Sequence, residues 1–215
     1  MQAQATREIV AKFGLHHDDP TALQFAANEM VYLGTSGVPG FYGLGGGRIR
    51  PSGLMRVHST LIEKSLVPVI VQVGDKRIAE KAYETAASEP TAKIRMEVSP
   101  PQTGLEQVEV TLESLAFARS GDKGNNANIG LIARKPEYLP YIHEQVTAQV
   151  VEDYFAHLVE GEVERFDLPG FNAFNFFMTE ALGGGGTASV RTDCQGKSLA
   201  QQLLSLKLAV PADLL

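Results

Sequence analysis

The pattern of hydrophobic and polar positions is clearest in the second half of the chain. Val108, Val110 and Leu112 alternate with polar residues, which is typical of a strand buried on one face, and we expect this strand to run on to Phe117. Further strands are predicted at residues 129–133, 163–168, 171–178, 187–191 and 206–210, and helices at 136–146, 147–158 and 198–204. Interleaved strands and helices predict an α+β fold, a ferredoxin-like sandwich in which helices cover one face of a mostly antiparallel sheet.

The first half of the chain has weaker periodicity. Asp19 followed by Pro20 is typical of a helix N-terminus, and apolar residues recur at helical spacing as far as Gly34. The other expected elements are helices at residues 5–13 and 75–84 and strands at 54–61, 67–73 and 93–98. The strand at 67–73 should be fully buried because it is almost continuously apolar. Residues 35–51 hold too much glycine and proline for regular structure.

A short segment at residues 99–104 marks the expected domain boundary. It contains Pro100, Pro101 and Gly104, and both residue types are poorly tolerated inside helices and sheets. We therefore expect a partial α/β segment over residues 1–104 and the ferredoxin-like domain over residues 105–215.

Composition and charge narrow the classes of partner. The chain of 215 residues has a formal net charge of −6, which argues against nucleic-acid binding because phosphate neutralisation needs concentrated lysine and arginine. The longest apolar stretch, residues 66–73, is too short to cross a bilayer, and the first residues lack the pattern of a secretory signal. Cys194 is the only cysteine, so no intrachain disulfide can form, and we interpret it as an incidental exposed thiol. We expect a cytoplasmic protein with no nucleic-acid or membrane partner.

The segment from Arg119 to Asn128 is the strongest candidate for a functional site. A hairpin between two strands needs only a few turn residues, and this polar segment is expected to form a longer loop. Gly121 and Gly124 let main-chain N–H groups converge on an anion, and Arg119 and Lys123 add positive charge. The remaining candidate ligands are hydroxyl, carboxylate and amide side chains: Ser120, Asp122, Asn125, Asn126 and Asn128. This combination predicts a site for a phosphate, a carboxylate or a thioester carbonyl. The alternative is a self-contained loop in which Asp122 pairs with Arg119 or Lys123.

A run of four glycines at residues 183–186 is the second unusual feature. Consecutive glycines cost conformational entropy on folding, and the cost is explained if the main chain at Gly184 and Gly185 must lie against a ligand or against residues 120–123. Arg191, shortly beyond the run, is a further candidate ligand for an anion. The alternatives are a flexible connector for the glycines and a surface salt bridge for Arg191.

Metal and cofactor sites are not expected. His16 and His17 are adjacent, and the other histidines, His58, His143 and His157, are isolated in the sequence. There is no pair of cysteines and no cluster of carboxylates at metal-ligand spacing. Neither glycine-rich stretch, residues 35–51 or 183–186, matches the phosphate-binding or dinucleotide-binding motifs. Ser120 does not match the hydrolase nucleophile motif either, because that motif has a glycine two residues before the serine.

Three motifs in order resemble the C-terminal domain of the acyclic terpene utilisation (AtuA) family. They are residues 115–130, 154–165 and 181–191, and the resemblance covers residues 107–208. It implies a ferredoxin-like fold and a role in bacterial catabolism of branched or isoprenoid acyl compounds such as citronellol and geraniol. Residues 35–52 look like the end of the family's large N-terminal domain. The segment 1–104 is therefore expected to be a truncated tail of that α/β domain, with a homo-oligomer or a partner subunit supplying the missing half.

Two hypotheses about function follow. In the first, an AtuA-like protein binds an anionic metabolite, either an acyl-CoA or a carboxylate. Lys123 and Arg119 neutralise its charge, Asp122 orients Lys123 or acts as a base, and glycine amides hold an oxyanion. Lys123 and Asp122 are then the candidate catalytic residues, and the sequence leaves open whether the chain is an enzyme. In the second, the chain is a non-catalytic interaction or assembly module that pairs with a separate N-terminal subunit, because apolar surface such as residues 67–71 needs cover.

Overall fold

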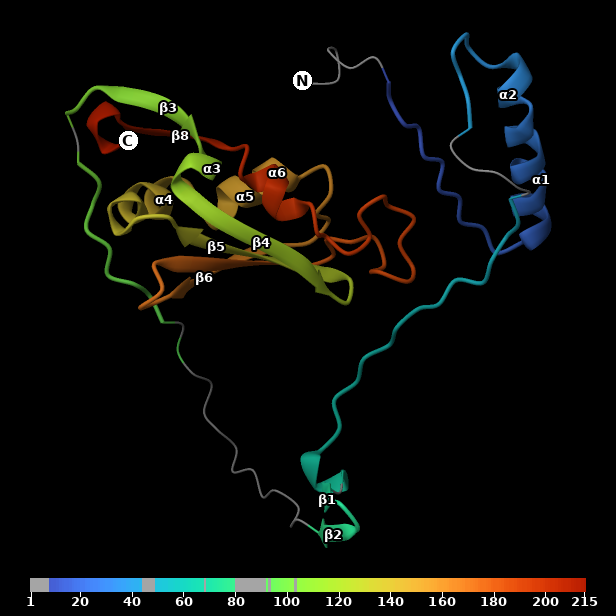
Figure 1. Ribbon diagram of the computed structural model, residues 1–215, viewed down its shortest axis with the longest axis horizontal. Coiled ribbons are helices and arrows are strands. Elements are labelled where there is room, and N and C mark those ends of the chain that lie inside the picture. The colour runs from blue at the N-terminus through green and yellow to red at the C-terminus, as the bar shows by residue number, and fades with distance from the viewer. Residues whose placement is uncertain (1–7, 44–48, 68, 80–91, 93, 103) are drawn as a thin grey trace.

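The computed structural model describes residues 8–43, 49–67, 69–79, 92, 94–102 and 104–215. The elements from residue 107 to residue 214 pack into a layered domain, and most of the described residues before them, called here the arm, lie outside it (Figure 1). No helix in the described part of the chain is long and apolar enough to cross a membrane.

The domain is built on a four-stranded sheet in which every neighbouring pair of strands is antiparallel. Its strands, in spatial order, are β4 (Ala116–Lys123), β5 (Asn126–Ala133), β7 (Ala173–Met178) and β6 (Val163–Leu168). The sheet therefore consists of two hairpins that lie side by side, β4–β5 and β6–β7. A separate antiparallel pair, β3 (Gln107–Thr111) and β8 (Lys207–Pro211), joins the two ends of the domain.

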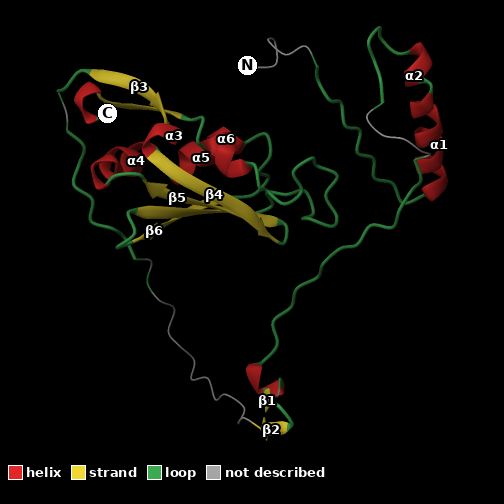
Figure 2. Cartoon of the chain, viewed as in Figure 1, coloured by secondary structure: helices red, strands yellow, loops and turns green. Residues whose placement is uncertain are grey.

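Helices cover one face of the four-stranded sheet (Figure 2). They are α3 (Leu112–Leu115), α4 (Leu139–Gln145), α5 (Ala148–Phe155) and α6 (Leu199–Leu203), with the 3-10 turns η3 (Pro136–Tyr138) and η4 (Ala212–Leu214). The sheet contributes alternate residues to the core beneath these helices, including Ile129 and Leu131 of β5 and Phe174 and Phe176 of β7, all of them fully buried. Such alternation is what a sheet with one covered face requires. The α+β fold with helices on one face is confirmed.

The opposite face of the sheet, called here the open face, is not covered by helices. Phe117 and Ile132 are paired across β4 and β5 on this face, and their exposed fractions are 55% and 48%. Asn128 of β5 and Asn175 of β7 lie further along the same face and hydrogen-bond to each other, with Nδ2 of Asn128 2.7 Å from Oδ1 of Asn175. Side chains on the open face are therefore available to a ligand or a partner.

The single strand predicted from residue 108 to Phe117 is wrong, because one turn of helix interrupts it. β3 ends at Thr111, α3 occupies Leu112–Leu115, and β4 begins at Ala116. Leu112 and Leu115 are both fully buried, and residues three apart share a face in a helix but not in a strand. The need to bury both leucines accounts for the interruption.

The arm begins with the helix that Asp19 and Pro20 predict. α1 spans Pro20–Val31, the Asp19 carboxylate accepts a hydrogen bond of 2.8 Å from the Thr21 N–H, and Pro20 is at the first helical position. The chain passes Gly34 in a second short helix, α2 (Leu33–Ser36), so the predicted stop at Gly34 is slightly early. Further along lie the 3-10 turn η2 (Lys64–Leu66) and the hairpin of β1 (Ile70–Val73) and β2 (Lys76–Ala79).

Several other predictions for the arm are wrong. Residues 8–13, 54–61 and 94–98 have no regular structure, and residues 76–79 form a strand where a helix was expected. The apolar strand β1 is exposed along its whole length, because nothing in the described part of the chain covers the two-stranded hairpin. Residues 5–7 and 80–84 of the predicted helices, and residue 93, lie outside the described residues. In the domain, residues 187–191 form turns rather than the expected strand.

The start of α6 is held by Asp193, although Ser198 occupies the N-cap position. The Ser198 side chain makes no capping hydrogen bond. The Asp193 carboxylate accepts hydrogen bonds from the N–H groups of Lys197 and Ser198, at 2.9 and 2.6 Å, and from the Ser198 hydroxyl at 2.6 Å. Burial raises the pKa of this carboxyl, but the hydrogen bonds from Ser198 and Lys197 outweigh burial and leave the pKa below its usual value.

Acid should therefore weaken the domain partly through Asp193. A carboxyl whose pKa is lower in the folded state stabilises the fold above its unfolded pKa of about 3.9, and the contribution is lost as the pH falls through the folded value. We expect Asp193→Asn to lower the urea midpoint at pH 7, and the difference from the natural chain to shrink below about pH 4. Equal differences at pH 7 and pH 3 would contradict this role.

Candidate functional site

The Arg119–Asn128 segment is a tight hairpin, so the predicted long loop is wrong. β4 runs through Lys123, β5 begins at Asn126, and only Gly124 and Asn125 form the turn. Gly124 has a φ of +69°, which is the conformation that a two-residue type II′ turn requires at its first position. Arg119 to Lys123 are polar because they belong to the edge strand β4, and a strand with one open face can carry polar side chains at alternate positions.

Alternation along β4 divides the candidate residues between the two faces of the sheet. Arg119, Gly121 and Lys123 lie on the open face, opposite Gly130, Asn128 and Asn126 of β5. Ser120 and Asp122 lie on the helix side, opposite Ile129 and Ala127. The segment therefore does not present all of its polar groups to one ligand.

Ser120 has a structural role. Its side chain is buried, its hydroxyl donates to the Gly196 carbonyl at 2.6 Å, and it accepts from the Ala200 N–H at 2.9 Å. These bonds tie β4 to the first turn of α6. Both hydrogen-bonding functions of the hydroxyl are used within the fold, which removes Ser120 from the groups that can contact a ligand.

A basic cluster forms at the edge of the open face from Arg119, Lys123 and Lys197. Lys197 reaches across the edge of β4, and its Nζ lies 3.3 Å from the point where a Cβ on Gly121 would be. The same Nζ is 3.9 Å from the Asp122 carboxylate, and this side chain of Lys197 is 62% exposed. Lys123 Nζ donates a hydrogen bond of 2.9 Å to the Asp122 carbonyl oxygen.

Lys197 is the member of the basic cluster that the sequence does not predict. It lies far from Lys123 along the chain, and its sequence neighbours Gly196 and Ser198 suggest only a turn before a helix. Lys197 joins the cluster through Gly121: this strand position has no side chain, and the Lys197 ammonium group fills the space. The Arg119 side chain is exposed, with no hydrogen bond or ion pair identified to another described residue.

The glycine run lies against the Gly124–Asn125 turn. The N–H groups of Ala181 and Leu182 both donate to the Asn125 carbonyl at 3.0 Å, and the Gly184 N–H donates to Oδ1 of Asn125. A Cβ on Gly185 would lie 2.6 Å from the Gly124 carbonyl oxygen, so the two main chains touch. The amide of Gly184 is thus bound to Asn125.

Two further candidate residues, Asn126 and Arg191, stabilise the fold around this contact. Oδ1 of Asn126 accepts the Glu180 N–H at 3.1 Å. Arg191 donates to the carbonyls of Leu158 and Ala181, at 2.8 and 2.6 Å, and pairs with Glu160 at 3.2 Å. Its guanidinium group lies where a side chain on Gly183 would be. Arg191 therefore anchors the start of the glycine run, and Asn128 remains on the open face in its pair with Asn175.

Within the described residues there is no group of three or more histidine, cysteine, aspartate or glutamate side chains that could hold a metal ion. Cys194 is a free, half-buried thiol. Two cavities of the described chain lie away from the basic cluster, one beside the arm and one beside β6, and neither is lined by residues 119–128 or 183–186.

The fold and the candidate site together define a class of protein: an α+β sandwich domain with one open sheet face and a basic cluster beside two glycine turns in contact. A family model described as the AtuA ferredoxin-like domain matches residues 110–209. Residues 110–209 accordingly form an AtuA ferredoxin-like domain, and the matched segment includes the hairpin, the glycine run and Lys197. No curated protein and no solved structure matches the chain.

Proposed function

We propose that this chain is an AtuA-like protein of acyclic terpene or branched acyl catabolism that binds an anionic small molecule through Arg119, Lys123 and Lys197. The ligand class is a carboxylate or an acyl-CoA, and the proposed location of the protein is the cytoplasm. One observation carries the proposal: Arg119 and Lys123 share a face of the edge strand β4 with Gly121, and Lys197 Nζ lies against Gly121. The Asp122 carboxylate is 3.9 Å from Lys197 Nζ.

The geometry suits an anion for three physical reasons. A guanidinium group binds a carboxylate or phosphate through two parallel hydrogen bonds, and each ammonium group adds a point charge. Gly130 of β5, which is paired with Arg119, carries no side chain, so a ligand can approach the main chain beside Arg119. The cluster is exposed, so a ligand can reach it from solvent without a change of the fold.

Asp122 acts as a positioning residue in this proposal. Its carboxylate lies beside Lys197 and its main-chain carbonyl accepts from Lys123, so it influences both ammonium groups. The Gly124–Asn125 turn and residues Gly184 and Gly185 form the support that fixes the end of β4. Lys123 remains the candidate for chemistry on a bound acyl group, since its Nζ is exposed at the end of the strand.

Titration calorimetry of the full chain with branched short-chain acids and their CoA thioesters tests the proposal. We expect saturable binding, and a loss of affinity of about tenfold or more for Lys123→Ala or Arg119→Ala, because a charge-assisted hydrogen bond contributes about 1.5–3 kcal/mol. Lys207→Ala is the matched control. The Lys207 side chain is 62% exposed, as is that of Lys197, but Lys207 lies on β8 and pairs with Glu109 of β3. Affinity that is the same in all variants would remove the basic cluster as the site.

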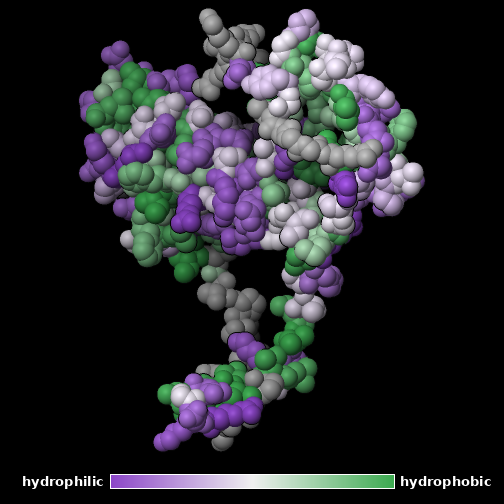
Figure 3. Space-filling model, turned by 45° about the vertical axis from the view of Figure 1, so that its right-hand side comes forward, coloured by the Kyte–Doolittle hydropathy of each residue, from purple (hydrophilic) through white to green (hydrophobic). Residues whose placement is uncertain are grey.

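An interaction or assembly module is the second candidate, and the exposed apolar side chains of the arm favour it. Ala27 is the only buried residue among the described residues before Leu105, whereas Leu61 is 99% exposed and Val57 is 75% exposed. Hydrophobic side chains also gather around the β1–β2 hairpin (Figure 3). A second copy or a separate subunit would cover this surface. Light scattering separates the candidates: a stable oligomer that binds no acyl compound favours assembly, and a monomer that binds one favours the first proposal.

A further inference from the structure

The open face of the four-stranded sheet carries a row of apolar side chains at one end. The ladder register pairs these residues in turn across all four strands: Phe117, Ile132, Ala173 and Leu168. Ala173 is buried, but Phe117, Ile132 and Leu168 are 55%, 48% and 39% exposed. Phe171, in the turn between Leu168 and Ala173, is 73% exposed. A contiguous apolar row of this kind is typical of a surface that meets another protein.

The β6 edge of the open face carries a negative charge. Glu164 lies between Val163, which is buried beneath the helices, and Arg165, which donates to the His143 carbonyl of α4 at 2.8 Å. Alternation along the strand therefore places Glu164 on the open face. The register puts it in the same transverse row as Gly121 of β4.

The basic cluster lies at the opposite edge of the same face. Arg119 and Lys123 flank Gly121 on this face of β4, and Lys197 Nζ lies against Gly121. The open face is therefore positive at its β4 edge and negative at its β6 edge. Such a face is complementary to a second copy of itself related by a twofold axis parallel to the strands, because this axis places β4 of each copy over β6 of the other.

This arrangement also places larger residues over smaller ones. Two sheets that pack face to face lie about 10 Å apart with their strands within about 30° of parallel, so the transverse rows of one copy lie over those of the other. Phe117 of one copy then meets Leu168 of the second copy within the apolar row. In successive rows the residues that meet differ in size: Ile132 over Ala173, Gly130 over Asn175 and Gly121 over Glu164.

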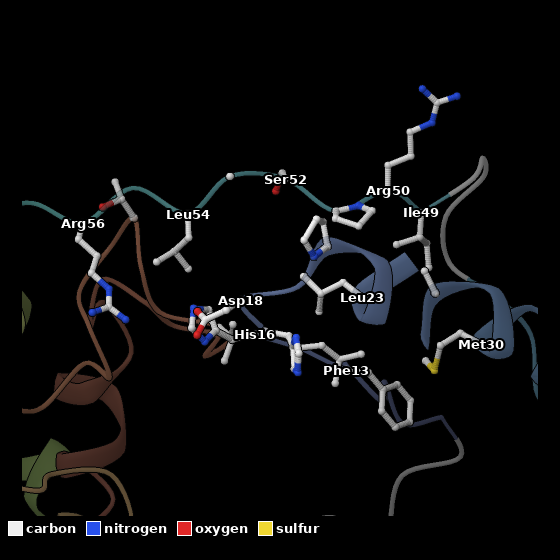
Figure 4. Close-up of a pocket in the computed structure, with 18 residues that line it drawn as sticks. Phe13, His16, Asp18, Leu23, Met30, Ile49, Arg50, Ser52, Leu54 and Arg56 are labelled. Atoms are coloured by element: carbon white, nitrogen blue, oxygen red, sulfur yellow. The ribbon is translucent and has the colours of Figure 1, made fainter. Parts of the chain in front are cut away.

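The arm meets the domain elsewhere. Residues 49–56 and the start of α1 line a cavity of about 1000 Å³ (Figure 4), and Thr187 of the domain closes one end of it and donates to the Met55 carbonyl at 2.7 Å. Ile94 lines a smaller cavity with Leu168 at the β6 edge. The exposed fractions of the apolar row are those that remain with the arm in place, so this row is open to a partner.

We propose that the open face is a dimerisation surface, on which two copies of this chain stack face to face and the basic cluster of each copy binds Glu164 of the other. The two apolar rows supply the buried contact, and the opposite charges determine the orientation of the copies. The dimer does not rest on the function proposed above and needs no ligand. A small anion at the basic cluster competes with the carboxylate of the second copy.

Sedimentation velocity of the full chain, in the absence of any acyl compound, tests this surface. We expect a dimer. Ile132→Asp and Glu164→Lys should each weaken dimerisation about tenfold or more, since the first buries a charge in the apolar row and the second brings like charges together. Leu61→Asp is the matched control, because Leu61 is an apolar side chain of the arm that is 99% exposed, and it should leave the dimer unchanged.

A charge exchange separates loss of the interface from loss of the fold. Arg119→Glu combined with Lys123→Glu should also weaken the dimer about tenfold or more, and adding Glu164→Lys to this pair should strengthen it again, because opposite charges then face each other in both halves of the contact. A natural chain that is monomeric would overturn the proposal. So would a dimer that Leu61→Asp breaks and Ile132→Asp does not, or a Glu164→Lys effect of the same sign in both backgrounds.

Discussion

Replacing Ser120 by alanine should lower the free energy of unfolding of the domain by about 2–4 kcal/mol. The substitution leaves the Ala200 N–H and the Gly196 carbonyl without the hydroxyl that they both bind, in a position that is 7% exposed. Each buried polar group left unpaired costs about 1–3 kcal/mol, which is why the loss exceeds that of an ordinary hydrogen bond. For a domain of this size the melting temperature should fall by on the order of 10 °C.

Urea unfolding followed by circular dichroism measures this effect. The midpoint should fall while the slope with urea concentration stays the same, because the substitution changes stability and not the surface exposed on unfolding. Ser114→Ala is the control, since Ser114 is exposed and its hydroxyl contacts only that of Thr111 at 3.4 Å. If Ser120→Ala has as little effect as Ser114→Ala and instead abolishes anion binding, Ser120 is a ligand-contacting residue after all.

The sequence predicts the domain well where burial follows the local pattern. The apolar residues at 129–133 identify most of β5, which begins earlier, at Asn126, and the pair β6–β7 is found on either side of Pro169 and Gly170. Asp19 and Pro20 locate the start of α1 because capping depends only on neighbouring residues. These elements are determined locally, so their prediction does not require knowledge of the rest of the fold.

Elements whose state depends on distant contacts are predicted poorly. The apolar run at residues 67–73 suggests a buried strand, but burial needs a second layer, and β1 has only β2 beside it. The polar composition of Arg119–Lys123 suggests a loop, but an edge strand with one open face has the same composition. In both cases the sequence shows which residues are apolar or polar, but it does not show which other element, if any, packs against them.

The candidate site also combines features that follow from the local sequence with features that depend on distant contacts. Arg119 and Lys123 share a face because residues of a strand two and four apart do so, and this can be worked out once the strand is recognised. Lys197 joins them only because Asp193 and Ser120 hold the start of α6 against β4. The contact between the two glycine segments is anticipated by the entropic cost of the glycine run, which a close approach of main chains explains.

That close approach leads to the second prediction of a large effect, from a matched pair of glycine substitutions. Gly170 and Gly185 have almost the same positive φ, +84° and +80°, so alanine at either position costs about 1–2 kcal/mol in the main chain alone. A Cβ on Gly170 meets nothing within 4 Å, whereas a Cβ on Gly185 lies 2.6 Å from the Gly124 carbonyl oxygen.

Gly185→Ala should therefore destabilise the domain by about 3 kcal/mol or more, and Gly170→Ala by about 1–2 kcal/mol. The obstructing atom belongs to the main chain of the β4–β5 turn, which cannot rotate out of the way as a side chain can, so the two turns must separate. Their separation loosens the bonds from Ala181 and Leu182 to Asn125 and with them the end of β4 that carries Lys123. Urea unfolding of both variants isolates the contact, because the main-chain cost cancels in the difference. Equal destabilisation would mean that the two glycine segments are not in contact in solution, and Lys123 would then lack the support on which the anion site depends.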